Sequence, residues 1–197
     1  MKKIYICIAM GIFFASCSTE EGTKESIQNL RTVNVDTQAS WNSIMTKIEN
    51  TCVQQSYNDT EEVIAYVESI AFENKDFQAL DKKNYESPES AEVEYLLTVN
   101  PANALSAMSY STATNYYLNQ MLVVNGPWAT NPAFDSNVSQ RDKQLLGFLS
   151  YTWGPDKDWD WDKMKPLAFV KGYENSVAKA IILSVVVKES EKIEKVN

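Results

Sequence analysis

Apolar side chains recur at helical spacing along most of this 197-residue chain, and this periodicity constrains its fold more than any other feature. The clearest case lies between residues 36 and 53, where one helix face would carry Trp41, Ile44, Met45, Ile48, Cys52 and Val53. A second stripe follows and comprises Val63, Ile64, Val67, Ile70 and Ala71. No Asn-Gly or Asp-Gly turn joins two alternating runs, so the sequence favours packed helices over β-hairpins.

Residues that cap helices mark where several of these helices begin. Asp59 is followed three residues later by Glu62, which is the pattern of a capping box. Ser87-Pro88 and Asn100-Pro101 each place a capping residue directly before a proline at the first helical position. Together with the pair Ser139 and Asp142, these signals predict helices over residues 59–71, 88–97, 101–124 and 139–153.

The final predicted helix runs from Pro166 to about Glu191 and contains the apolar run 180–187. This run is rich in β-branched residues, so a buried strand is the competing interpretation. Its helix-like flanks favour a central buried helix, and the run is too short to cross a membrane. We therefore expect an all-α fold, a single irregular bundle of about six or seven helices.

The N-terminal residues differ in character from the rest of the chain. Met1-Lys2-Lys3 is a basic start, residues 4–14 are apolar, and Ala15-Ser16 supplies small side chains before Cys17. These three parts predict a secretory signal. The quartet Phe14-Ala15-Ser16-Cys17 resembles the lipobox of bacterial lipoproteins. The chain is then divided into a signal peptide (1–16), a lipidated tether (17–35) and a helical domain (36–197).

The resemblance implies that Cys17 is acylated and becomes the first residue of the mature protein. Ser18, rather than Asp, follows the cysteine, which in this family favours the outer membrane over inner-membrane retention. The pair Glu20-Glu21 is similar to the acidic signals that carry some lipoproteins to the cell surface. Two acyl chains give stable anchoring. We therefore expect lipid anchoring at the bacterial outer membrane, with the cell surface as an alternative location.

The composition excludes several kinds of chemistry. The chain has no histidine, which excludes Ser-His-Asp and Cys-His hydrolases, His-ligated zinc and histidine proton shuttles. Removal of Lys2 and Lys3 with the signal changes the formal net charge from −8 to −10, so no nucleic acid is expected as a partner. Cys52 is then the remaining free thiol, and its place in an apolar stripe indicates a buried structural cysteine.

The segment 153–165 has the most chemical character. It contains four alternating carboxylates and three tryptophans, namely Asp156, Asp158, Asp160, Asp162, Trp153, Trp159 and Trp161. The aspartates are similar to a calcium loop, but Trp161 occupies the position that needs glycine and Leu167 the position that needs glutamate. Alternatively, the tryptophans line a groove for a carbohydrate or a peptide. We favour a structural interpretation, in which the tryptophans hold the loop on the bundle and the aspartates face water.

A second aromatic loop is predicted over residues 125–138. Trp128 and Phe134 are bulky residues in a loop with two prolines, where side chains are usually polar. If both loops gather at one end of the bundle, they form an aromatic patch suited to an interaction. The alternative is that Trp128 and Phe134 close the core.

Together these features predict an outer-membrane or surface lipoprotein that acts as a non-catalytic protein-binding module, of an envelope-accessory or immunity type. Its expected partners are the membrane, through the acyl chains, and an envelope protein, and the expected contact residues are Trp128, Phe134, Trp153, Trp159 and Trp161. No cofactor is expected, with calcium at the four aspartates as the alternative. Two other functions stay open. One is a surface carbohydrate- or peptide-binding lipoprotein, and the other is an acid–base hydrolase, for which no spacing selects a carboxylate pair.

Overall fold

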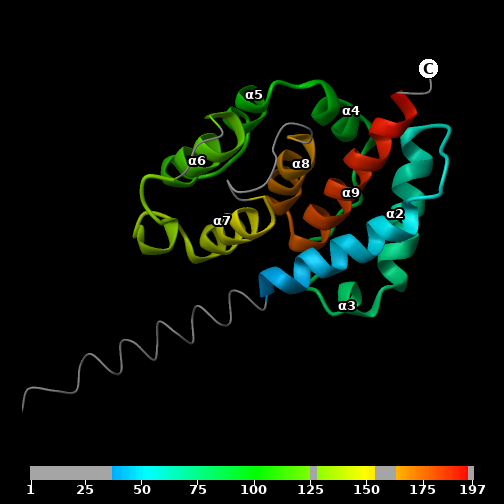
Figure 1. Ribbon diagram of the computed structural model, residues 1–197, viewed down its shortest axis with the longest axis horizontal. Coiled ribbons are helices and arrows are strands. Elements are labelled where there is room, and N and C mark those ends of the chain that lie inside the picture. The colour runs from blue at the N-terminus through cyan, green and yellow to red at the C-terminus, as the bar shows by residue number, and fades with distance from the viewer. Residues whose placement is uncertain (1–36, 125–127, 154–162, 195–197) are drawn as a thin grey trace, which may run out of the picture. The chain divides into compact units, whose positions relative to one another are not determined.

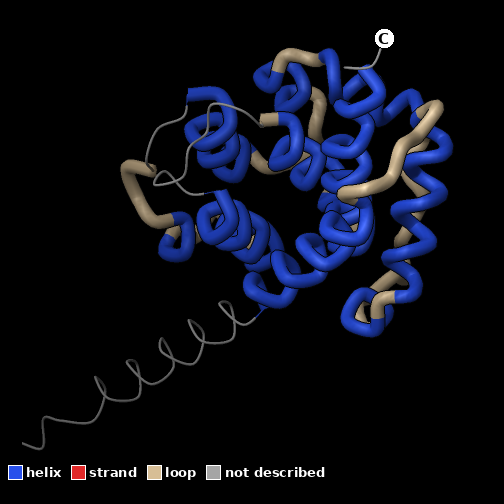
Figure 2. Tube along the Cα trace, turned by 45° about the vertical axis from the view of Figure 1, so that its right-hand side comes forward, coloured by secondary structure: helices blue, strands red, loops and turns tan. Residues whose placement is uncertain are grey.

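The computed structural model describes residues 37–124, 128–153 and 163–194. These residues form helices joined by loops and turns (Figure 1). The first helix covers residues 37–52. Eight further α-helices follow, namely α2 (Thr60–Glu73), α3 (Lys75–Gln78), α4 (Ser90–Thr98), α5 (Pro101–Ser106), α6 (Thr112–Asn119), α7 (Gln140–Trp153), α8 (Met164–Tyr173) and α9 (Val177–Glu194). A π-helical turn, η1 (Gln120–Val124), continues α6, and a 3-10 turn, η2 (Pro132–Phe134), precedes α7. These ranges contain no strand (Figure 2), so the predicted all-α class is confirmed.

Helix α9 lies at the centre of the described part. Every residue of its apolar run 180–187 is buried, and the helix packs against α8, α2 and α4 (Figure 1). A helix that is apolar on all sides is stable only when other elements surround it. The prediction of a central buried helix is therefore confirmed, and the competing strand is excluded.

The predicted final helix is divided into α8 and α9. The break falls at residues 174–176, where the Ser176 hydroxyl accepts a hydrogen bond from the Lys179 amide (3.1 Å) and starts α9. The two helices then pack very closely. A Cβ atom added at Gly172 on α8 would lie 2.6 Å from the Cα atom of Ala180 on α9, so only glycine fits there.

The prediction of one helix over residues 101–124 is wrong, because tertiary hydrogen bonds interrupt it. The Ser109 amide donates to the Glu174 carboxylate (2.6 Å), and the Tyr110 hydroxyl donates to the carbonyl of Val170 (2.7 Å). The Ser111 hydroxyl then accepts from the Thr114 amide (3.1 Å) and starts α6. Contacts with the end of α8 thus replace the helical bonds between α5 and α6.

The predicted helix starts are confirmed where a side chain makes the capping bond. Asp59 accepts from the Glu62 amide (2.8 Å), and Asn100 accepts from the Ala102 amide (2.9 Å). The Ser139 hydroxyl likewise accepts from the amide of Asp142 at 3.0 Å. The start at Ser87-Pro88 is wrong, because α4 begins at Ser90 after Glu89, whose side chain makes no capping bond.

The first helix supplies a central part of the core. The ring of Trp41 lies 5.5 Å from Phe148, 6.4 Å from Phe169 and 6.0 Å from Tyr173, measured between centroids. The other predicted members of its stripe are buried, with the exception of Val53, which is 64% exposed. The helix ends at residue 52, so the helical spacing no longer applies to Val53.

Ion pairs with little exposure also connect the first helix to α8 and α9. The Glu49 carboxylate pairs with Lys165 on α8 and with Lys188 on α9, the latter at 3.2 Å. The side chains of Glu49 and Lys165 are 12% and 11% exposed. Ion pairs that are largely removed from water cost stability when one partner is lost, because the other charge stays buried.

Candidate functional site

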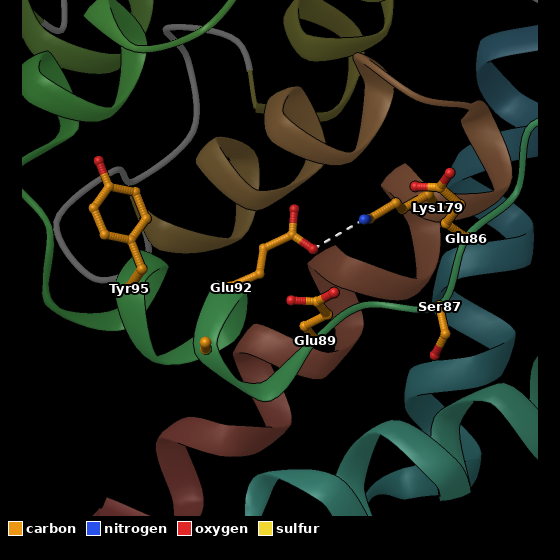
Figure 3. A pocket seen from close by; sticks show the side chains of 7 residues that line it. Glu86, Ser87, Glu89, Glu92, Tyr95 and Lys179 are labelled. Carbon is orange, nitrogen blue, oxygen red and sulfur yellow. Dashed lines mark ion pairs between the residues drawn. The ribbon is translucent and has the colours of Figure 1, made fainter.

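A hollow of about 660 Å³ opens on the surface where α4 packs against α9 (Figure 3). We call it the α4–α9 hollow, and it is lined by Glu86, Ser87, Glu89, Ala91, Glu92, Tyr95 and Lys179. The first three residues belong to the segment before α4, the next three to α4, and the last to α9.

Local sequence explains why α4 presents these side chains. Val93 and Leu96 are fully buried and attach the helix to the core. Glu92 and Tyr95 are three residues apart, so they lie on one face of the helix, at the hollow. Tyr95 is 46% exposed, which leaves much of its ring accessible.

Negatively charged side chains outnumber positively charged ones in the lining of the α4–α9 hollow. Lys179 Nζ lies 3.0 Å from Glu92 Oε2 (Figure 3), and these side chains are 11% and 18% exposed, so the pair is largely shielded from water. Glu86 and Glu89 have no ion pair within the described residues. The lining therefore carries three carboxylates against one ammonium group, together with an aromatic ring. This arrangement suits a cationic group, which carboxylates attract and an aromatic face stabilises.

Trp128 and Phe134, both predicted as partner contacts, have different environments. The Trp128 indole N–H donates to the carbonyl of Tyr117 (3.0 Å), and the two rings meet edge to face at 5.8 Å. Trp128 therefore packs on α6, in line with the alternative that it closes the core. Phe134, at the end of η2, is 79% exposed and thus accessible to a partner.

Trp153, the last residue of α7, belongs to the aromatic core. Its ring meets Phe148 and Phe169 edge-on at 5.6 and 6.1 Å, and Lys165 Nζ lies 5.8 Å from its centroid. The other predicted site residues lie outside the described residues, namely Cys17, Asp156, Asp158, Asp160, Asp162, Trp159 and Trp161. Their lipidation, calcium and ligand roles stay predictions.

Cys52 has the environment of a structural cysteine. The thiol is buried at the end of the first helix. Burial, reinforced by the negative charge of Glu189, raises the pKa of the thiol to about 11. Because the thiolate is the reactive form, this thiol is unreactive near neutral pH, and the prediction of a buried cysteine is confirmed.

Metal binding and membrane insertion are two other roles on which the described ranges bear. No three Asp, Glu or Cys side chains within these ranges are arranged to hold a metal ion. Across the same ranges, none of the helices combines the length and the apolar character needed to cross a bilayer. The comparisons with known proteins found no matching family, no matching curated protein and no matching solved structure.

The α4–α9 hollow was not predicted from the sequence. A signal for part of it was present, because Glu86, Glu89 and Glu92 recur every three residues around the start of α4. The contribution of Lys179 had no signal, since it comes from a helix far along the chain.

Proposed function

We propose that this protein is a non-catalytic protein-binding module, held at the bacterial outer membrane by acyl chains on Cys17. Its partner presents a basic segment to the α4–α9 hollow. The observation that carries the proposal is the excess of carboxylates beside the exposed ring of Tyr95. The lipobox-like residues 14–17 support the anchor.

The hollow favours a lysine or arginine side chain over other ligands for physical reasons. A cation that approaches Glu86 and Glu89 meets two carboxylates that form no ion pair within the described residues. The ring of Tyr95 lies at the opposite end of the lining from Glu86 (Figure 3), so it offers a further contact for another aliphatic or cationic part of the same basic segment. The formal net charge, −8 for the full chain and −10 without residues 1–16, attracts a basic partner over a longer distance and repels phosphates. Such charges contribute to specificity and to the rate of association more than to affinity.

The first test is crosslinking of the tagged full-length chain in intact cells, followed by capture and mass spectrometry. We expect one dominant envelope protein. The double variant Glu86→Gln/Glu89→Gln should weaken binding of that protein by about tenfold, since two partly screened charge contacts are lost. Binding should also weaken as the salt concentration rises.

A matched control separates the hollow from general charge. The double variant Glu73→Gln/Glu94→Gln removes the same two charges from exposed positions that do not line the hollow. We expect it to bind normally. Equal losses in both double variants would show that net charge alone determines binding and would refute the role of the hollow.

The anchor has its own test. The variant Cys17→Ser removes the thiol that the acyl chains require, so the precursor should stay unprocessed or reach the wrong location. Membrane fractionation and intact-mass measurement report both results. Normal mature protein in the outer membrane of this variant would contradict the proposed anchor.

A further inference from the structure

Phe134 is the most exposed of the large apolar side chains in the described ranges, at 79%, and Val53 follows at 64%. Burial of a phenylalanine side chain is worth about 1.5–3 kcal/mol, and here the fold does not use it. The neighbouring aromatic residue of the same loop, Trp128, packs against Tyr117 instead. The packing of residues 128–138 therefore does not explain why position 134 is aromatic.

Several hydrogen bonds fix the loop that carries Phe134. Asn131 accepts a bond from the Ala133 amide (2.9 Å), and the Phe134 amide donates to the Asn131 carbonyl (3.1 Å). On the other side, Asp135 accepts bonds from the Asn137 amide (2.8 Å) and from the Tyr117 hydroxyl (3.0 Å). A side chain on a fixed loop loses little conformational entropy when it binds, so this loop is preorganised for contact.

The charge beside Phe134 indicates which kind of surface it meets. The hydrogen bonds from the Asn137 amide and the Tyr117 hydroxyl lower the pKa of Asp135, and the positive charge of Lys143 lowers it further, so the carboxylate is ionised at neutral pH. A ring that entered an anionic membrane surface would bring this carboxylate, on a chain whose net charge is negative with or without residues 1–16, toward like charge. A protein pocket with basic residues at its rim is complementary to both groups.

We propose that Phe134 is a preformed anchor that enters an apolar pocket on the protein partner, with a lysine or arginine at the pocket rim facing Asp135. This inference rests on the proposed function, because it adds a second contact to the same partner. Buried aromatic anchors surrounded by polar contacts supply much of the binding energy in protein interfaces.

Site-specific photocrosslinking in intact cells tests the proposal. p-Benzoylphenylalanine replaces Phe134 in the full chain, and a control chain carries it at Val53, an exposed apolar position in another part of the sequence. We expect light to link position 134 to the protein that the α4–α9 hollow binds, at a peptide with apolar and basic residues. A product with lipid, with a second copy of this chain or with residues 154–162 of the same chain would overturn the proposal. So would a yield no greater than that at position 53.

Affinity measurements with the captured partner distinguish this inference from the proposed function. Phe134→Ala should weaken binding by about tenfold to a hundredfold, and Phe134→Leu by much less. Asp135→Asn should reduce the dependence of binding on salt. If Glu86→Gln/Glu89→Gln weakens binding and Phe134→Ala does not, the anchor is wrong and the proposed function stands. If no envelope protein is captured at all, both are wrong.

Discussion

Gly172 provides the most direct test of how α8 and α9 pack. A Cβ atom at this position would lie 2.6 and 2.7 Å from the Cα and N atoms of Ala180, and 2.8 Å from the carbonyl carbon of Lys179. These neighbours are backbone atoms inside a buried helix, so no side-chain rotation can move them away. We therefore predict that Gly172→Ala forces the two helices apart.

The expected loss in the free energy of unfolding is a steric cost reduced by a gain in helix propensity. Carbon atoms pack best at about 3.5–4.0 Å, so the helices must separate by roughly 1 Å and disturb the buried contacts of α9. Overpacking of this kind costs about 1–3 kcal/mol, and the backbone obstacle places it at the upper end. Relative to glycine, alanine stabilises the helix by up to about 1 kcal/mol through its higher helix propensity. The net loss in the free energy of unfolding is therefore about 2 kcal/mol, or roughly 4–8 °C in the melting temperature.

Gly147 on α7 is the matched control. A Cβ atom there meets the end of the Gln38 side chain, with Nε2 at 2.2 Å, and a side-chain end is displaced at lower cost than backbone atoms. Gly147→Ala should gain the same propensity at little steric cost. Urea unfolding followed by circular dichroism measures both variants. Equal stability of the two variants would refute the close approach of α8 and α9.

Three further predictions concern stability. Glu49→Gln should lower the free energy of unfolding by about 3 kcal/mol, measured by urea unfolding, because the ammonium groups of Lys165 and Lys188 lose their shared carboxylate; an unchanged midpoint would contradict the buried pairing. Asp59→Ala should cost about 1 kcal/mol through loss of the cap on the Glu62 amide, whereas Asp59→Asn should retain most of that stability. The free energy of unfolding should fall as the pH rises from about 9 to about 11, because the unfolded chain releases the Cys52 proton at lower pH than the folded chain, where the pKa of the thiol is about 11. Cys52→Ala should reduce this slope, and an identical slope would assign the alkaline loss to other groups.

Local signals in the sequence predicted the elements whose causes are themselves local. The caps at Asp59, Asn100 and Ser139 depend on residues two or three positions away, and each one forms. The buried run 180–187 was predictable because it has no polar face to expose. Because these features depend on neighbouring residues, they can be predicted from the local sequence without knowledge of the rest of the fold.

Features that depend on distant partners were not predictable. The break after α5 is caused by Glu174 and Val170, more than fifty residues away in the sequence. The α4–α9 hollow needs Lys179 beside Glu92, which the packing of two helices brings together. Trp128 and Phe134 look equivalent in the sequence. The difference between them depends on the folded structure, in which the Trp128 indole donates a hydrogen bond to the Tyr117 carbonyl.

The pairing of the first helix with the last two has a consequence for biosynthesis. Glu49 and Lys188 are 139 residues apart in the sequence, and Trp41 packs on rings that belong to α8. A nascent chain therefore cannot close this core until its last helix has been made, and contacts of such long sequence separation form slowly. Until then, the apolar face around Trp41 is accessible to chaperones, and a chain truncated before α9 is a ready substrate for proteases.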